Sequence, residues 1–175
     1  ELGKQIGIPL DTEYLLVTFH PVTMEPDGGL SQFKNLLKAL EKNRVEKIIF
    51  TRPNADPLGI TLIKMIGAFV RKNRKRAFVF TSLGAIKYLS AMKHSAAVVG
   101  NSSSGIIEAP SLHIPVVNIG NRQKGRIRAA SVLDSAPDES SILKSINRAL
   151  SGQFRKKCEN ASNPYEKDNT SRKIV

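Results

Sequence analysis

The fold is decided by the stretch Val98-Val99-Gly100-Asn101-Ser102-Ser103-Ser104-Gly105-Ile106-Ile107-Glu108. A buried strand runs into small, hydroxyl-bearing residues, and a helix begins directly after them. The free N–H groups and the positive end of a helix at such a junction favour a bound phosphate, and small side chains let it approach. The alternative is that Ser102, Ser103 and Ser104 only cap the helix. The spacing alone leaves both interpretations open.

Short β-rich runs alternate with helical patterns on both sides of this junction. That alternation is typical of βαβ units, and it predicts an α/β fold with a Rossmann-like parallel sheet flanked by helices. We expect strands over residues 14–19, 47–51, 77–80, 96–99 and 115–119, and a sixth over residues 131–133. We expect helices over residues 31–40, 57–70, 85–93, 105–112 and 140–150, and a terminal helix from Ser171.

Three local signals refine these helices. Ser31 is placed to cap the first helix, and Asp56 followed by Pro57 reads as an N-cap with proline at the first helical position. On the helix over residues 85–93, the spacing predicts that Ile86, Leu89 and Met92 face inward.

The composition describes an ordinary soluble domain with an unusual charge. The 175 residues are 41% hydrophobic, and 27 Lys and Arg against 15 Asp and Glu give a net charge of +12. Such a charge predicts an anionic partner, whether nucleic acid, membrane surface, phosphorylated substrate or an acidic neighbouring domain. The most apolar stretch, residues 59–70, contains Lys64 and is too short to span a bilayer.

The single cysteine, Cys158, cannot form an internal disulfide, and no Cys/His cluster has zinc-ligand spacing. These features fit a reducing compartment, and we expect a cytoplasmic protein that needs no metal or cofactor. The chain opens at Glu1 in a loop-like stretch without an initiator methionine, so we expect a piece of a longer protein.

Ligands of parallel α/β sheets bind beyond the carboxyl ends of the strands. The candidate binding loops are therefore those that follow Phe19, Thr51, Phe80, Val99 and Ile119. His20 follows the first strand, where a proton donor or phosphate ligand would stand, although a lone histidine is often structural. Arg122 lies in a glycine-bearing basic loop, residues 120–128, which either clamps a phosphate or is simply solvated. Asn54 follows the second strand and either lies over the site or belongs to a plain turn.

Three further residues suit a nucleoside. Leu83 and Tyr88 are placed to hold a flat base between backbone groups and a ring, although Tyr88 alone reads as a core aromatic. Glu108 can accept from the hydroxyls of a ribose, or it can interact with the helix dipole. The basic run Arg71–Arg76 is either a nucleic-acid patch or a solvated helix end, and we favour the helix end.

Four strings carry a family resemblance: "TFHPVT" at 18–23, "RPNAD" at 52–56, the long string at 100–129 and "NPY" at 163–165. Together they resemble the UDP-N-acetylglucosamine 2-epimerase family, most closely its hydrolysing, sialic-acid-type branch. The non-hydrolysing branch typically carries "GHRRE" and "ERPE" in the corresponding places, and neither string is present.

The resemblance implies a GT-B architecture, of which residues 1–175 would be the single C-terminal, nucleotide-binding domain, with the N-terminal catalytic half absent from the chain. It implies that His20 contacts the diphosphate or the reacting sugar and is the catalytic residue here. The expected UDP-binding residues are Asn54, Leu83, Tyr88, Ser102, Ser103, Ser104, Gly105, Glu108 and Arg122.

The implied reaction eliminates UDP from UDP-N-acetylglucosamine to give a glycal, to which water adds, releasing N-acetylmannosamine and UDP. The implied partners are the UDP-sugar, the N-terminal domain of the same protein and, in the full-length protein, a homo-oligomer; the domain alone would be inactive. Nucleic acid and membrane are not expected partners. Two alternatives remain, a GT-B glycosyltransferase domain and a basic nucleic-acid-binding module.

Overall fold

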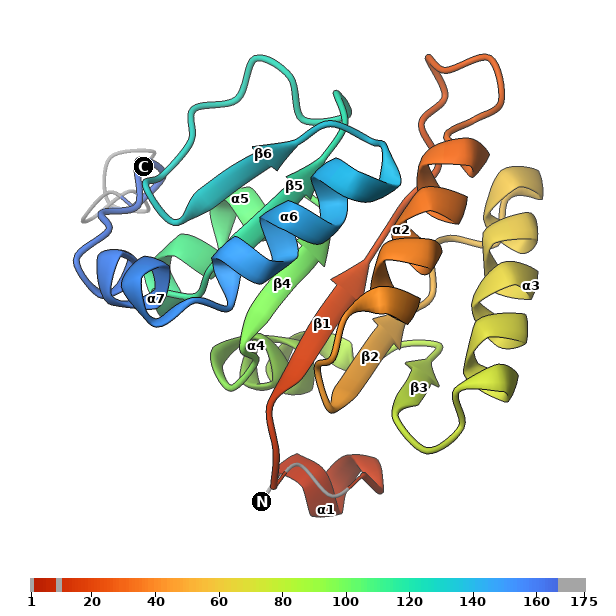
Figure 1. The fold of residues 1–175 in the computed structure, drawn as a ribbon, viewed down its shortest axis with the longest axis horizontal. Coiled ribbons are helices and arrows are strands. Elements are labelled where there is room, and N and C mark those ends of the chain that lie inside the picture. The colour runs from red at the N-terminus through yellow and green to blue at the C-terminus, as the bar shows by residue number, and fades with distance from the viewer. Residues whose placement is uncertain (1, 9–10, 167–175) are drawn as a thin grey trace, which may run out of the picture.

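The computed structural model describes residues 2–8 and 11–166, and it contains one six-stranded parallel sheet (Figure 1). The order of the strands is β3-β2-β1-β4-β5-β6, so the direction of winding reverses between β1 and β4. The expected α/β class with a Rossmann-like parallel sheet is confirmed. The strands are β1 (Tyr14–Thr18), β2 (Lys47–Thr51), β3 (Ala77–Phe80), β4 (Ala97–Gly100), β5 (Val116–Ile119) and β6 (Val132–Ser135).

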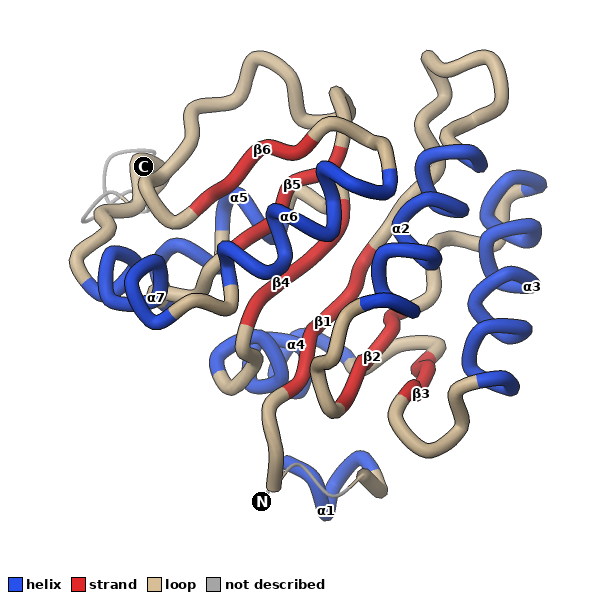
Figure 2. Tube along the Cα trace, in the orientation of Figure 1, coloured by secondary structure: helices blue, strands red, loops and turns tan. Residues whose placement is uncertain are grey.

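Helices cover both faces of the sheet, as the tube in Figure 2 shows. One face packs against α2 (Leu30–Lys42), α3 (Pro57–Lys72) and α6 (Glu139–Ala149). The other face packs against α4 (Gly84–Lys93) and the 3₁₀ helix η1 (Ala109–Leu112). The remaining helices are α1 (Leu2–Ile6), α5 (Ser104–Ile107) and α7 (Gly152–Glu159).

The central strand β1 shows why these residues form a buried strand. All five of its residues are buried, and they alternate between the two apolar layers. Leu15 and Val17 belong to the larger cluster under α2, α3 and α6, whereas Tyr14 and Leu16 belong to the cluster under α4. A strand covered on both faces needs apolar residues at successive positions, and the run over residues 14–19 supplies them.

The predicted cap of α3 is confirmed, but the predicted cap of α2 is wrong. The Asp56 carboxylate accepts a hydrogen bond from the backbone N–H of Gly59 at 2.7 Å, and Pro57 opens α3. Ser31 instead lies inside α2, and its N–H donates to the Asp27 carboxylate at 2.8 Å. Asp27 reaches the start of this helix because Gly29, at a φ of 83°, turns the chain back over it.

Helix α4 also differs from its prediction. Met92 is buried as expected, but Ile86 is 86% exposed and Leu89 is 41% exposed. The side of α4 that packs on the sheet carries Tyr88, Ala91 and Met92, a second stripe at helical spacing. The inward orientation predicted for Ile86 and Leu89 is therefore wrong.

Other predicted boundaries need smaller corrections. The helix expected over residues 105–112 is divided into α5 and η1, and the strand expected over residues 131–133 runs from Val132 to Ser135. Helices α1 and α7 were not predicted. The terminal helix expected from Ser171 lies outside the described residues. Within the described ranges, no helix is long and apolar enough to cross a membrane.

Part of the basic run Arg71–Arg76 holds the fold together. The Arg76 guanidinium donates to the carbonyls of Leu40, Asn43 and Val45, at 2.8, 2.9 and 3.2 Å. These carbonyls lie at the end of α2, where backbone acceptors lack helical partners. Arg76 therefore caps the carboxyl end of α2 with its side chain. This cation of the basic run has a structural role in the fold.

Candidate functional site

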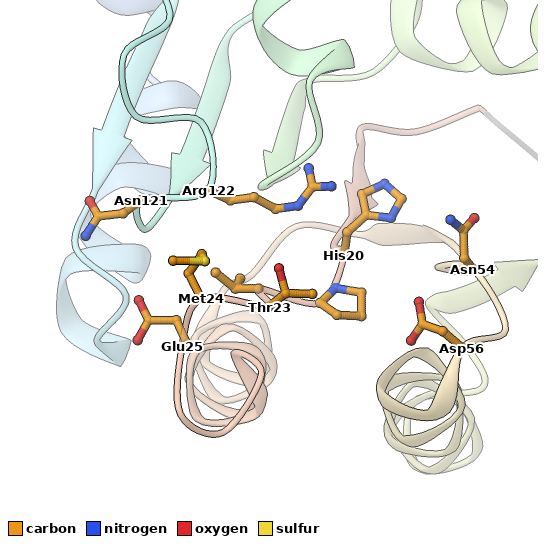
Figure 3. A pocket seen from close by; sticks show the side chains of 10 residues that line it. His20, Thr23, Met24, Glu25, Asn54, Asp56, Asn121 and Arg122 are labelled. Carbon is orange, nitrogen blue, oxygen red and sulfur yellow. The ribbon is translucent and has the colours of Figure 1, made fainter.

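A hollow of about 360 Å³ opens at the carboxyl edge of the sheet, where the strand order reverses (Figure 3). Its walls come from the segments that follow β1, β2 and β5. The residues that line it are His20, Pro21, Val22, Thr23, Met24, Glu25, Asn54, Asp56, Asn121 and Arg122. The structure thus brings together three of the predicted site residues, His20, Asn54 and Arg122, from three separate segments.

His20 occupies the middle of this hollow. Figure 3 shows the Arg122 guanidinium extending toward the imidazole from one side, with Asn54 and Asp56 on the other. Burial and the positive charge of Arg122 lower the pKa of His20 below its ordinary 6.5, and the Asp56 carboxylate offsets part of this effect. The neutral form of the imidazole is therefore favoured at pH 7.

Arg122 supplies the permanent charge of the site. Burial and the neighbouring Arg126 lower the pKa of its guanidinium from 12.5, yet the group stays protonated at neutral pH. A guanidinium fork beside an imidazole that gains a proton when an anion binds is an arrangement suited to a phosphate or diphosphate.

Asn101 connects the loops that carry these two groups. Its side chain accepts from the backbone N–H of His20 at 2.7 Å and donates to the His20 carbonyl at 2.8 Å. Its own carbonyl accepts from Arg122 at 3.3 Å and from the Gln123 side chain at 2.8 Å. The sequence contains no signal for this role, because the two partners of the side-chain contact lie 81 positions apart.

The serines of the strand-to-helix loop lie next to Asn101. Ser103 immediately precedes α5, but its side chain makes no capping hydrogen bond. The Ser102 hydroxyl accepts from the Ser104 hydroxyl at 3.0 Å and from the Ser104 N–H at 3.4 Å. The capping interpretation therefore fails for Ser103, and it holds in a weak form for Ser102.

Tyr88 joins this loop to α4. Its hydroxyl lies 2.7 Å from the Ser104 Oγ and 3.3 Å from the Thr18 Oγ1. Leu83 and Tyr88 are both half-buried and pack with the apolar cluster on this side of the sheet. The tyrosine therefore has a structural role, and its predicted contact with a base stays a prediction.

Gly105 and Glu108 do not line the hollow. Gly105 is buried, and a Cβ built on it would lie 2.9 Å from Val116 Cγ1, so glycine allows α5 to pack closely on β5. Glu108 is exposed between α5 and η1. Over residues 2–8 and 11–166, no group of three His, Cys, Asp or Glu side chains is placed to hold a metal ion.

Comparison with known proteins assigns the family. The model of the family described as UDP-N-acetylglucosamine 2-epimerase matches residues 2–175. The chain belongs to this family. The resemblance carried by the four sequence strings is thereby confirmed.

Two curated relatives of this 2-epimerase-family chain are informative. The GDP/UDP-N,N'-diacetylbacillosamine 2-epimerase (hydrolyzing) of Campylobacter jejuni is 42% identical over 135 residues, which are 77% of this chain and 35% of the relative. The polysialic acid biosynthesis protein P7 of Escherichia coli is 37% identical over 158 residues, 89% of this chain and 40% of the relative. These matches support the hydrolysing branch, and the chain spans well under half of either relative.

A solved structure agrees on the fold. The S. aureus MnaA-UDP co-structure superposes with a TM-score of 0.76 at 15% identity, over 100% of this chain and 46% of that one. The expected correspondence between this epimerase-family chain and half of a GT-B fold is confirmed.

Proposed function

We propose that this chain is the C-terminal, nucleotide-binding domain of a hydrolysing 2-epimerase acting on UDP-N-acetylglucosamine. The observation that carries the proposal is the hollow in which His20 and Arg122 meet at the reversal of the strand order. Crevices at this point of open α/β sheets bind nucleotides. The choice of UDP-N-acetylglucosamine is supported by the description of the family. The choice of the hydrolysing branch is supported by the name of the C. jejuni relative, which acts on a diacetamido sugar.

In the proposed site, different loops bind different parts of the nucleotide. Arg122 and His20 bind the diphosphate, and Asn54 lies across the hollow from Arg122. Ser102 and Ser103, with the neighbouring backbone amides and the small residues Ser104 and Gly105, form the phosphate-binding loop. Glu108 holds the ribose, and Leu83 with Tyr88 contacts the uracil. Support for the first group comes from its shared hollow. Leu83, Ser102 and Ser103 lie in loops at the same sheet edge. The roles of Tyr88, Gly105 and Glu108, which belong to or follow the helices after those loops, are supported by the family resemblance.

In this proposal the domain stabilises the leaving group. Elimination of UDP breaks the C1–O bond of the sugar and removes the C2 proton, and negative charge develops on the departing diphosphate. Donors that contact this charge more strongly in the transition state accelerate the step. The Arg122 guanidinium is such a donor, and so is the His20 imidazole through a ring N–H.

The other reacting groups belong to the rest of the protein. We propose that the carboxylates which move the C2 proton lie in an N-terminal half, that the complete enzyme is a cytoplasmic homo-oligomer, and that this domain alone is inactive. The net charge of +12 is then partly explained by a small anionic substrate rather than by a nucleic acid.

The reaction itself provides the test of this proposal. The full-length protein incubated with UDP-N-acetylglucosamine in D₂O is expected to release UDP and N-acetylmannosamine with one deuterium at C2. The deuterium is expected because the glycal takes its C2 proton from solvent while hydroxide adds at C1. Transfer of the sugar to an acceptor would indicate a glycosyltransferase instead, and a free sugar without deuterium would contradict the elimination. A diacetamido UDP-sugar, assayed in parallel, identifies the preferred sugar.

UDP affinity is expected to increase as the pH falls. The pKa of His20 in the free protein lies below 6.5, and a bound diphosphate raises it because negative charge favours the imidazolium. The complex therefore binds more protons than the free protein between these two pKa values, so Kd falls with pH there and levels off below the lower one. Calorimetric titrations from pH 5 to 8 check this expectation.

The matched control is His20→Gln. This variant should lose the part of the pH dependence that exceeds the titration of UDP itself. If the pH profiles of the wild type and of His20→Gln coincide, His20 does not contact the diphosphate.

A further inference from the structure

Asn101 continues the pairing of β1 with β4 beyond the end of the strands. The ladder closes with Thr18 opposite Gly100, and the Asn101 N–H still donates to the Thr18 carbonyl at 3.2 Å. The chain then diverges, and the Asn101 side chain takes over the pairing. Its amide exchanges two hydrogen bonds with the backbone of His20, as a residue of a neighbouring strand would.

The amide of Asn101 is enclosed within the protein and is fully used in hydrogen bonds. Asn101 has 0% of its surface exposed, and both polar ends of its side chain are used on one residue. An amide is suited to this task because it carries a donor and an acceptor side by side. A carboxylate lacks the donor, and an alanine would remove both of these partners from the backbone of His20.

The backbone carbonyl of Asn101 fixes the other side of the hollow. It accepts from Arg122 and from Gln123, whose side chain is buried. The Gln123 carbonyl in turn accepts from Arg128 at 2.9 Å, and Arg128 pairs with Asp134 of β6 at 3.1 Å. The basic loop is thus tied to the sheet at two points, and one of them is Asn101.

We propose that Asn101 is a positioning residue that sets the distance between His20 and Arg122. Its side chain forms two hydrogen bonds with the backbone of His20, and its backbone carbonyl accepts a hydrogen bond from the Arg122 guanidinium. This inference rests on the proposed function, because the distance matters only if both groups bind one diphosphate. Asn101 acts through His20 and Arg122 and does not itself touch the substrate.

A double-mutant cycle in the full-length protein tests the proposal, with UDP affinity measured by calorimetry. Asn101→Ala is expected to weaken UDP binding about tenfold, because two buried hydrogen bonds that orient His20 are lost. In a His20→Ala background the same substitution should change the affinity less than twofold, because there is no imidazole left to orient. The carbonyl at position 101 persists in every variant, so the cycle isolates the side chain.

A matched control separates positioning from stability. Asn43 is another buried asparagine, and it does not line the hollow. Its side chain donates to Asn147 and accepts from the backbone N–H of Val45, both at 2.9 Å. Asn43→Ala is expected to lower the free energy of unfolding and to leave UDP affinity unchanged. Asn101→Ser adds no charge and replaces the amide with a single short hydroxyl, and it runs the same cycle if the alanine variant does not fold.

The possible outcomes distinguish the positioning role of Asn101 from the proposed function of the domain. A loss of affinity of equal size in both backgrounds, or no loss from either Asn101 variant, overturns the positioning role while the proposed function stands. Absence of UDP binding by the wild-type protein overturns the proposed function itself. A strong effect confined to the background that contains His20 supports the proposal.

Discussion

Replacing Gly100 with alanine is expected to lower the free energy of unfolding of this chain by about 3 kcal/mol or more, because strained backbone and a steric clash coincide there. Gly100 ends β4 at a φ of 143°, which side chains rarely adopt. A Cβ built there would lie 1.9 Å from the carbonyl oxygen of Thr18 on β1. The two strands would have to separate at the edge that carries the site.

Two other glycines separate the contribution of backbone strain from that of the steric clash. Gly84 has a φ of 65° but nothing within 4 Å of its built Cβ, so Gly84→Ala should cost only the strain, about 1 kcal/mol. Gly152 opens α7 without a positive φ and with equally open space, so Gly152→Ala should be neutral or slightly stabilising. Urea unfolding followed by circular dichroism ranks the three variants. If Gly100→Ala is no worse than Gly84→Ala, the close contact between β1 and β4 is wrong.

Replacing Arg122 with alanine is expected to weaken UDP binding by the full-length protein about 10- to 100-fold. The estimate follows from the loss of charge-assisted hydrogen bonds, which contribute about 1.5–3 kcal/mol each. Arg122→Lys should fall between the wild type and the alanine variant, because lysine keeps the charge but lacks the two-pronged donor. Calorimetry with UDP at one ionic strength gives all three affinities.

The control for Arg122 lies two residues away. Lys124 belongs to the same basic loop, is exposed and does not line the hollow. Lys124→Ala removes the same charge and should change the affinity by less than about twofold, because Lys124, unlike Arg122, does not line the hollow and its charge is screened by solvent. Equal losses from both substitutions would indicate a diffuse attraction. UDP binding that survives both Arg122→Ala and Ser103→Ala unchanged would contradict the assignment of the site.

The sheet was predictable because its strands are apolar at successive positions. Residues 14–19 are apolar throughout apart from Thr18, which is the pattern of a strand covered on both faces. The cap at Asp56 was predictable because the acceptor, the proline and the helix are adjacent in sequence. The region of the hollow followed from the rule that loops at the carboxyl ends of parallel strands meet.

The errors share one physical cause, which is that local spacing fits more than one arrangement. On α4 both the stripe with Ile86 and Leu89 and the stripe with Tyr88 and Ala91 suit a helix face, and only the packed sheet selects the second. At the start of α2, both Ser31 and Asp27 could accept hydrogen bonds from free backbone N–H groups. The turn at Gly29 brings the Asp27 carboxylate to the helix, and Ser31 lies inside it.

Asn101 could not have been predicted from the sequence at all. Its partners are the backbone of His20 and the side chains of Arg122 and Gln123, which reach it from two other loops. A role that consists of long-range hydrogen bonds to backbone atoms leaves no pattern in neighbouring residues. The sequence therefore predicted the groups that face a ligand better than the group that holds them in place.

The central claim is that the diphosphate of UDP binds between His20 and Arg122, and a crystal structure of the full-length protein with UDP tests it most directly. We expect electron density for the diphosphate within the hollow, with the Arg122 guanidinium and the His20 imidazole both within hydrogen-bonding distance of its oxygens. UDP bound elsewhere, with this hollow filled only by solvent, would contradict the account.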